Sequence, residues 1–302
     1  MFLSIGSIIL DDIVLPNGVT RMGMLGGGSP HAAMGMRLWT DHVGLLCGVG
    51  SDFPPDNLSD LQAVFDTRGV LVRQKRTPRA WQLFETDGSR TEIFRTPVED
   101  LVQMEVSPGE YPFGDEQILG VHLQSPAFMV IDWARFLRAK GCRFILWEPW
   151  DTDCTSQNRQ TFYSIASEVD AVSVSIREAQ QVTSRLSPPE IIEDLFIGGA
   201  KMVALRMGGK GSLVAQVGKP TKAIDTVAVP KIVDFTGAGN AYGGGFVIGY
   251  CQSADAGIAG RYGAVSASFA LEQFGALYAL SDLAAERARR YCLCEVRDID
   301  EK

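Results

Sequence analysis

The chain has 302 residues and a formal net charge of −8, with 46% hydrophobic and 21% charged residues. This composition is typical of a globular protein whose length permits one large core. Its acidity excludes the broad basic surface that binding to a nucleic-acid backbone requires, so we expect no nucleic-acid partner. No stretch approaches the roughly 18 uninterrupted apolar residues of a membrane span, and the six cysteines lack the spacing of a disulfide framework. We therefore expect a cytoplasmic protein that does not bind membranes.

Short apolar segments alternate with helical patterns along most of the chain. Residues 1–10 are apolar, carry no basic residue and are followed at once by Asp11 and Asp12, which predicts a buried first strand rather than a signal peptide. Further buried strands are predicted at Val43–Gly48, Ile118–Leu123, Phe144–Trp147, Ala171–Val174 and Met202–Leu205. Helices are predicted at Pro126–Lys140, Gln157–Glu168, Pro188–Ile197, 238–251, 254–273 and 281–291. The alternation predicts an α/β fold whose mostly parallel central sheet has helices on both faces.

Two segments depart from this alternation. Residues 11–24 and 72–96 show the period of β-strands without helices, and Asp87-Gly88 separates two strand-like runs in the manner of a hairpin turn. We predict that these segments form a small β-sheet, which acts as a lid on a single domain spanning residues 1–302. The exposed strand edges of such a lid would allow a homodimer to form through it.

The most informative segment is the glycine-rich turn after Val233. Its residues Asp234-Phe235-Thr236-Gly237-Ala238-Gly239-Asn240 lead into an apolar helix with three more glycines at 243–245. A turn of this kind directs backbone N–H groups to one point at the positive end of a helix, where an anion can bind. Each glycine inside the helix costs about 1 kcal/mol relative to alanine, so the backbone must approach something closely there. Tight helix packing alone is the alternative explanation.

The context of two other glycine patterns argues against the motifs that they resemble. Gly237, Gly239 and Gly243 mimic a dinucleotide fingerprint, but that motif follows a first strand, whereas this one lies in the last quarter of the chain and we expect no strand after it. An NAD(P)-dependent oxidoreductase is therefore not indicated. The segment Gly208–Ser212 lacks the residue order of a P-loop.

Seen together with the rest of the chain, Asp234–Gly239 resembles the second signature of the PfkB carbohydrate kinase family, D-T-x-G-A-G-D, with Phe235 in place of the usual threonine. Other segments resemble motifs of this family in the same order along the chain: Gly6–Asp11, Gly26-Gly27, Val43–Asp52, Val174–Ala179 and Arg206–Gly211. The resemblance spans nearly the whole chain and implies the ribokinase-like fold with its β lid.

The resemblance also implies phosphoryl transfer from ATP, with Mg²⁺, to a hydroxyl group of a small molecule such as a sugar or nucleoside. It implies an anion hole for the transferred phosphate at Gly237, Ala238 and Gly239. The positions that match nucleotide-binding residues are Arg206, Gly208, Gly211 and Thr236. The positions that match substrate-binding residues are Asp11, Gly27 and His31. Glu178 would hold the metal through water, and the lid would exclude water from the reaction.

Three positions differ from the family's pattern. The aspartate that acts as general base is Asn240 here, and an amide cannot accept a proton at neutral pH, although it can orient a hydroxyl group. The asparagine of the N-x-x-E motif is Ser175, and the asparagine expected after Gly26-Gly27 is His31. Ser29 and Pro30 are typical of an N-cap and a first helical residue, which places His31 at a helix start beside the pocket.

Several roles stay open at this level. His31 is a replacement base, a ligand contact or a polar residue of the helix start, and Glu148 belongs to the surroundings of the metal or merely ends its strand. The aromatic residues Trp81, Phe84 and Phe94 cover a ligand or form the core of the lid, while His42 and His122 are interpreted as structural or surface residues.

Two functions follow from these alternatives. One is a kinase that tolerates Asn240 or has another base, since the loss of a general base typically costs roughly 10²–10⁴-fold in rate. The other is a pseudokinase that binds a nucleotide or metabolite in a regulatory or scaffolding role.

Overall fold

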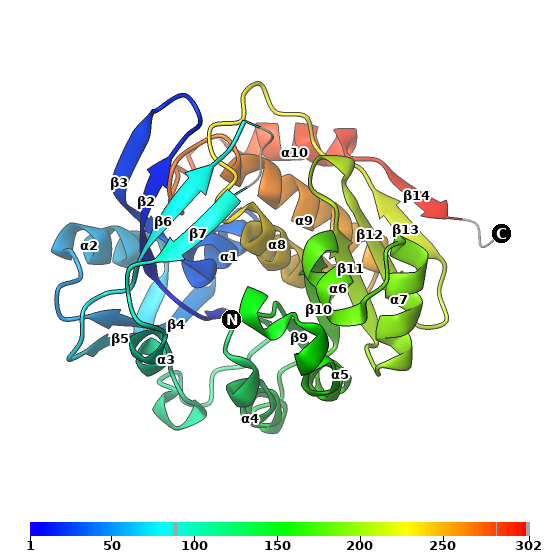
Figure 1. The fold of residues 1–302 in the computed structure, drawn as a ribbon, viewed down its shortest axis with the longest axis horizontal. Helices are drawn as coiled ribbons and strands as arrows, with labels where there is room; N and C mark the ends of the chain where they lie inside the picture. The colour runs from blue at the N-terminus through cyan, green and yellow to red at the C-terminus, as the bar shows by residue number, and fades with distance from the viewer. Residues whose placement is uncertain (87–89, 282, 300–302) are drawn as a thin grey trace.

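The structure, a computed structural model, describes all residues except 87–89, 282 and 300–302. Its centre is a ten-stranded sheet with the order β14-β13-β12-β11-β10-β9-β8-β1-β4-β5 (Figure 1). These strands are β1 (Phe2–Ile5), β4 (Val43–Gly50), β5 (Asp66–Arg73), β8 (Gly120–Leu123), β9 (Phe144–Trp147), β10 (Ala171–Ser175), β11 (Met202–Arg206), β12 (Ser212–Gln216), β13 (Thr221–Ile224) and β14 (Val296–Ile299). All pairs from β11 to β5 are parallel, whereas β12, β13 and β14 are antiparallel additions. The predicted mostly parallel sheet is confirmed.

Helices cover both faces of this sheet. The α-helices are α1 (Gly28–Arg37), α2 (Pro55–Val64), α3 (Val98–Met104), α4 (Ala127–Ala139), α5 (Arg159–Glu168), α6 (Ile176–Thr183), α7 (Pro188–Ile197), α8 (Ala238–Ser253), α9 (Ala256–Ala270) and α10 (Leu283–Leu293). On one face α8 and α9 pack together over the sheet beside α1, and on the other face lie α4, α5, α6 and α7 (Figure 1). All six predicted helices are present, each with bounds that differ by no more than a few residues.

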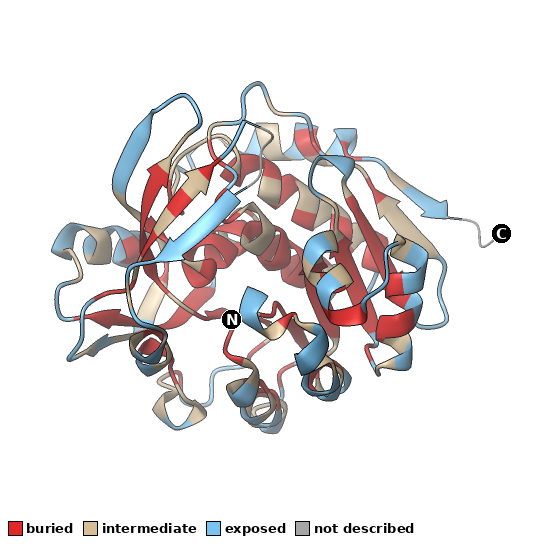
Figure 2. Cartoon of the chain, viewed as in Figure 1, coloured by how far each residue is buried: buried red, intermediate tan, exposed pale blue. Residues whose placement is uncertain are grey.

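The two-sided burial explains the continuous apolar runs of the sequence. In β9, Phe144 and Leu146 pack into the core that contains α8, whereas Ile145 and Trp147 pack into the core that contains α4 and α5. Successive side chains of a strand point to opposite faces, so a strand covered on both faces must be apolar at every position. Figure 2 shows the central strands buried along their length.

A second sheet of four strands stands beside the carboxyl end of β1 and has the order β3-β2-β6-β7. Its strands are β2 (Ile9–Val14), β3 (Thr20–Gly26), β6 (Arg79–Phe84) and β7 (Arg90–Phe94). We call it the small sheet. It contains most of the two segments expected to form a lid, although residues 72–73 belong to β5 of the large sheet. The Asp87-Gly88 turn lies outside the described residues.

Two expectations about element boundaries are wrong. A strand does follow the glycine-rich turn, because β14 pairs with β13 through an antiparallel register from Val296 to Ile299. The helix α1 begins at Gly28 rather than after Ser29, with Gly27 as its N-cap. Gly27 has a φ of 92°, a left-handed conformation that glycine adopts without strain, so the cap is set by backbone geometry rather than by a serine side chain. The described part of the chain contains no helix that could span a lipid bilayer.

Candidate active site

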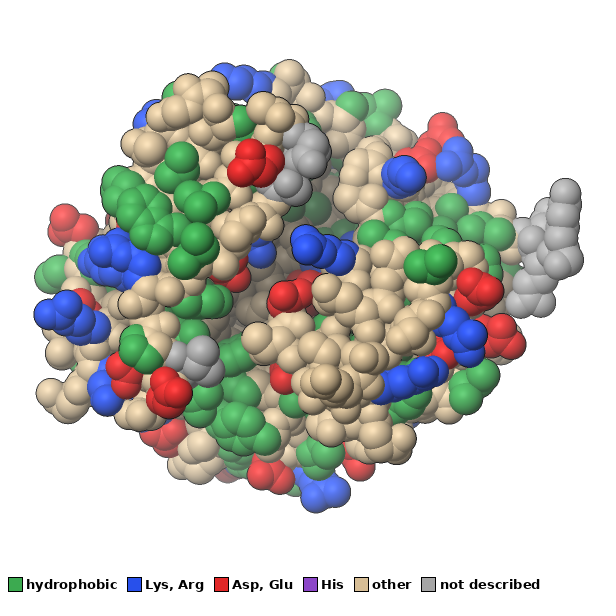
Figure 3. Space-filling model, in the orientation of Figure 1, with side chains coloured by type: hydrophobic (Ala, Val, Ile, Leu, Met, Phe, Trp, Pro, Cys, Tyr) green, Lys and Arg blue, Asp and Glu red, His purple; other side chains and the backbone are tan. Residues whose placement is uncertain are grey.

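The residues singled out in the sequence gather at one edge of the large sheet. Glu148 directly follows β9, Glu178 lies in α6 after β10, and Arg206 ends β11, while Asp11 lies in strand Ile9–Val14, which the chain enters after the carboxyl end of β1. These are the carboxyl ends of parallel strands, which is where open α/β sheets bind their ligands. Figure 3 shows the surface hollowed in this region, between the small sheet and α6.

The start of α8 has the geometry of an anion site. Asp234 Oδ1 accepts hydrogen bonds from the Thr236 amide (2.9 Å) and hydroxyl (2.8 Å), which folds the chain into a turn. Gly237 then adopts a φ of 73° as the N-cap of α8. The amide of Ala238 donates to Phe235 O at 3.3 Å, and Ala241 is the first residue to donate to a carbonyl four positions earlier, at 2.9 Å. The amides of Gly239 and Asn240 lie between them at the positive end of the helix, where an anion is favoured.

His31 packs against this turn from α1. A Cβ at Gly237 would lie 2.0 Å from His31 Cγ, so the imidazole ring takes the space that a side chain would need. His31 is buried, and its Nε2 has no hydrogen-bond partner among the described residues. Burial, helped by the charge of Arg90, lowers the pKa of His31 to about 4. The ring is therefore neutral at physiological pH.

Arg206 packs against the same turn from the other side. A Cβ at Gly239 would lie 1.8 Å from Arg206 Nη1, so the guanidinium group touches the backbone at the helix start. Arg206 Nη2 pairs with Glu148 at 2.8 Å and lies 3.6 Å from Glu178. Burial lowers the pKa of Arg206, but the charges of Glu148 and Glu178 outweigh this and raise it overall. The guanidinium group thus stays charged.

Glu148 is the centre of this charged cluster. Besides Arg206 it contacts the buried His122, whose Nε2 lies 2.7 Å from Glu148 Oε2. Burial raises the pKa of Glu148, but Arg206 and His122 outweigh burial, with a smaller contribution from the Asn240 amide, so this pKa lies below its usual value. Glu148 is therefore an ionised group within the site, and His122 is a structural residue that holds it. The two residues come from different parts of the sheet. No fixed spacing in the sequence therefore indicates that they pair.

One of the two carboxylate oxygens of Glu178 is engaged in the fold. Its Oε2 accepts a hydrogen bond from the Ser175 amide at 2.7 Å, while Ser175 Oγ accepts one from the Glu178 amide at 3.2 Å. The pair forms a capping box at the start of α6. No group of three His, Cys, Asp or Glu side chains in the described part of the chain could hold a metal ion. The described side chains thus offer no set of three direct metal ligands, whereas contact with a metal through water, the role expected for Glu178, stays a prediction.

Asp11 lies on the inner face of the small sheet. Its Oδ1 accepts a hydrogen bond from Gln82 Nε2 at 2.8 Å, and the same nitrogen donates to Glu92 Oε1 at 2.6 Å. A Cβ at Gly26 would lie 1.8 Å from Asp11 Oδ2, so the first glycine of Gly26-Gly27 makes room for the carboxylate. Burial raises the pKa of Asp11 to about 7 despite the hydrogen bond from Gln82. Sequence reasoning missed Gln82 and Glu92, although both follow the alternation of β6 and β7.

The three aromatic residues of the small sheet have different surroundings. Phe84 is buried and its ring centroid lies 6.0 Å from that of Phe235 in the glycine-rich turn. Phe94 pairs with Ala80 on the same face of the sheet but is 40% exposed. Trp81 points to the opposite face of the sheet, because side chains alternate along a strand. There the Arg95 guanidinium group lies over its ring. Only Phe84 and Phe94 therefore face the site.

The remaining glycines divide between packing and the site. In α8, Cβ atoms at Gly244 and Gly245 would lie 1.9 Å from Ala32 O and 2.3 Å from Ser266 Oγ, so these two allow tight helix packing, as the alternative explanation held. Gly211 allows close approach to Ile224 O in β13, whereas Gly208 has open space around it and a φ of 58°.

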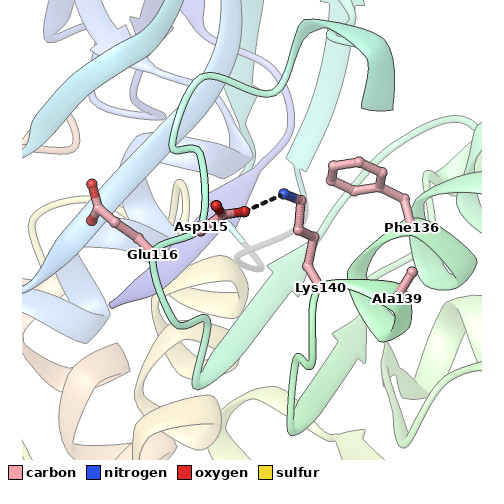
Figure 4. Close-up of a pocket in the computed structure, with 5 residues that line it drawn as sticks. All are labelled: Asp115, Glu116, Phe136, Ala139 and Lys140. Atoms are coloured by element: carbon pink, nitrogen blue, oxygen red, sulfur yellow. Dashed lines mark hydrogen bonds and ion pairs between the residues drawn. The ribbon is translucent and has the colours of Figure 1, made fainter.

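A surface pit lined by Asp115, Glu116, Phe136, Ala139 and Lys140 lies at the opposite edge of the sheet and contains one ion pair, from Lys140 to Asp115 at 3.3 Å (Figure 4).

Comparisons with known proteins agree with this geometry. The model of the pfkB family carbohydrate kinases matches residues 4–283. The chain belongs to this family. The cytidine kinase of Thermococcus kodakarensis is 29% identical over 250 residues, which cover 82% of this chain and 87% of that protein. Kinase homologues of this kind support phosphoryl transfer, and nothing in the comparisons specifically supports a pseudokinase.

Solved structures that are similar to this chain have the same fold. The nucleoside kinase of Methanocaldococcus jannaschii, an archaeal member of the ribokinase family, has a TM-score of 0.75 at 20% identity and covers 97% of this chain and 98% of its own. A putative ribokinase II from E. coli, solved in complex with ATP and Mg²⁺, has a TM-score of 0.75 at 19% identity, with 97% and 99% covered. The ribokinase-like fold implied by the motifs is confirmed.

Proposed function

We propose that this PfkB family protein transfers a phosphoryl group from ATP to a hydroxyl group of a nucleoside or a related sugar. One observation carries the proposal: the open amides at the start of α8 lie between Arg206 and His31, because both side chains touch the glycines of the same turn. Fixed N–H groups and a fixed positive charge are what an anionic transition state requires. The nucleotide would enter with Mg²⁺ as the counter-ion of its phosphates rather than as a metal held by the protein.

The side chains around the turn suggest how the acceptor would be held. Asp11 would accept hydrogen bonds from substrate hydroxyl groups, within reach of the Gln82 and Glu92 pair. The Glu148 carboxylate accepts hydrogen bonds only, so Asn240 would direct its NH₂ group toward Glu148 and its carbonyl oxygen toward the reacting hydroxyl. The neutral imidazole of His31 would take up the proton that leaves this hydroxyl as the new O–P bond forms and ADP departs.

A nucleoside fits the inner face of the small sheet better than a small sugar alone. The face combines acceptors for hydroxyl groups, at Asp11 and Glu92, with the aromatic side chains of Phe84 and Phe94. An aromatic base can stack on such rings, and hydroxyl groups of a ribose can reach the acceptors. The similarity to a cytidine kinase supports the same choice.

The direct test is release of ADP from ATP, with Mg²⁺, in the presence of cytidine, other nucleosides, ribose and fructose. We expect turnover with at least one nucleoside by the native chain, and a higher rate for Asn240→Asp. Binding of ATP without turnover by either protein would instead support the pseudokinase, and absence of both binding and turnover would contradict the proposal.

We also propose that a second copy of the chain pairs with the small sheet. Its edge strand β7 is exposed along its whole length, and Ile93 is 48% exposed on it. An exposed apolar edge strand is a template for strand pairing. Light scattering after size-exclusion chromatography should show a dimer that Ile93→Lys dissociates, and a monomeric native chain would contradict this assembly.

A further inference from the structure

The Arg206 guanidinium group has one side engaged and one side open. Nη2 is held by Glu148 at 2.8 Å and by Ser173 O at 3.5 Å, with Glu178 at 3.6 Å. Nε is buried without a partner, and Nη1 has no hydrogen-bond partner among the described residues. Because a guanidinium group is planar and rigid, fixing Nη2 also fixes the direction of Nη1. Nη1 lies against Gly239, at the start of α8.

We propose that Arg206 is a built-in cation that binds the phosphate chain of the nucleotide, and that its pairing with Glu148 and Glu178 replaces charge that a protein-bound metal would supply. The inference rests on the proposed function, because it assigns a ligand to the same site. Arginine suits this task, since its donors contact phosphate oxygens directly and its charge is permanent.

The pairing with glutamates positions Arg206 for phosphate rather than competing with it. A guanidinium group has five N–H donors, and Glu148 takes one or two of them on Nη2, which leaves the donors of Nη1 free. His122 holds the other Glu148 oxygen at 2.7 Å, so the carboxylate cannot rotate away. A cation oriented by a glutamate also contacts nucleotide phosphates in protein kinases, which shows that an ion pair of this kind is compatible with phosphate binding.

Of the four oxygens of these two carboxylates, only Oε1 of Glu178 has no partner among the described residues, which limits direct metal binding. Glu148 uses one oxygen for Arg206 and the other for His122, and Glu178 uses Oε2 for its capping box. Any Mg²⁺ would then be held by phosphate oxygens and water, and nucleotide affinity would depend on it only weakly. Removal of the arginine should reverse this. Glu148 and Glu178 would repel phosphate in the absence of metal and would become available to hold a hydrated Mg²⁺ in its presence.

Isothermal titration calorimetry with inorganic tripolyphosphate, and separately with ATP, tests this reversal. Each titration is done once in EDTA and once with Mg²⁺. We expect the native chain to bind with affinities that differ by less than about tenfold between the two buffers. Arg206→Gln should bind about 100-fold more weakly than the native chain in EDTA, because charge-assisted hydrogen bonds to phosphate are lost. It should recover a large part of this loss with Mg²⁺.

A second variant covers the case in which Arg206→Gln does not fold. Arg206→Gln combined with Glu148→Gln leaves no unpaired charge at this pair, and we expect it to lose the same affinity in EDTA. The matched control is Arg159→Gln combined with Asp194→Asn, which removes an ion pair of 2.6 Å to a buried aspartate outside the site and should bind like the native chain. Native binding only with Mg²⁺, or variant binding as tight as native binding in EDTA, would overturn the inference alone. Absence of native binding in both buffers would overturn the proposed function as well.

Discussion

The imidazole ring of His31 and the backbone of Gly237 fit against each other so closely that residue 237 has no room for a side chain. A methyl group at residue 237 would lie 2.0 Å from His31 Cγ and 2.2 Å from His31 Nδ1. The contact joins the first turn of α1 to the N-cap of α8, and therefore joins the half of the site that faces the small sheet to the half that would bind phosphate. The position where the family has an asparagine thus forms a side wall of the proposed anion site.

His31 should make the free energy of unfolding depend on pH. Its pKa is lowered from 6.5 to about 4 by burial and by the charge of Arg90. Between these values the unfolded chain binds the proton and the folded chain does not, so stability falls as the pH falls from 6.5 toward 4. Between pH 7 and pH 5 the free energy of unfolding should fall by about 2 kcal/mol less in His31→Asn than in the native chain. Urea unfolding at the two pH values measures this difference. Parallel curves for the two proteins would show that His31 is not buried in its neutral form.

Asp11 should impose a pH dependence on substrate recognition. Burial raises its pKa to about 7, so Asp11 is fully ionised only above that pH. The ionised form is the one that accepts hydrogen bonds from hydroxyl groups. We expect kcat/KM for the acceptor to rise between pH 6 and pH 8. Asp11→Asn should remove this rise and lower kcat/KM by about 10- to 100-fold. If native kcat/KM does not change over this range, Asp11 does not contact the acceptor in its ionised form.

Asn240→Asp should restore a base beside Glu148. Burial raises the pKa of Glu148, and Arg206, His122 and the Asn240 amide lower it, so a carboxylate at 240 would replace a donor by a like charge. We expect kcat to rise by about 10²-fold in the variant, with the acid limb of its pH–rate profile above the usual pKa of an aspartate. Addition of Glu148→Gln should move that limb to lower pH. An unchanged kcat in both variants would mean that residue 240 does not face the reacting hydroxyl.

The large sheet could be predicted because its central strands are buried on both faces and are therefore unbroken apolar runs. Phe144–Trp147 was predicted with its exact bounds for this reason. None of the three antiparallel strands at the other edge was predicted, and β13, for example, has the sequence Thr-Lys-Ala-Ile and is partly exposed. The N-cap of α1 was predicted at the wrong residue. Gly27 caps this helix through its positive φ, and no side-chain pattern in the sequence indicates such a conformation.

Residues of the candidate site could be predicted only where they belong to a recognisable sequence motif. The order of the motifs located Asp11, Arg206 and the turn at Gly237, all of which the structure brings to one edge of the sheet. The pairing of Glu148 with His122 and the role of Gln82 between two carboxylates depend on contacts between strands that are distant in the chain. Such contacts have no fixed spacing, so a single sequence does not reveal them.

Binding of ATP to Gly237→Ala tests the central claim, that the turn before α8 is an anion site. The variant adds a methyl group against His31 at a φ of 73°, whereas the control Gly218→Ala adds one at a φ of 74° with nothing within 4 Å. Both changes carry the same backbone strain, about 1–2 kcal/mol, so their difference isolates the collision at the site. Calorimetry should show that the native chain and Gly218→Ala bind ATP alike and that Gly237→Ala binds at least tenfold more weakly. Equal affinities for all three proteins would contradict the account.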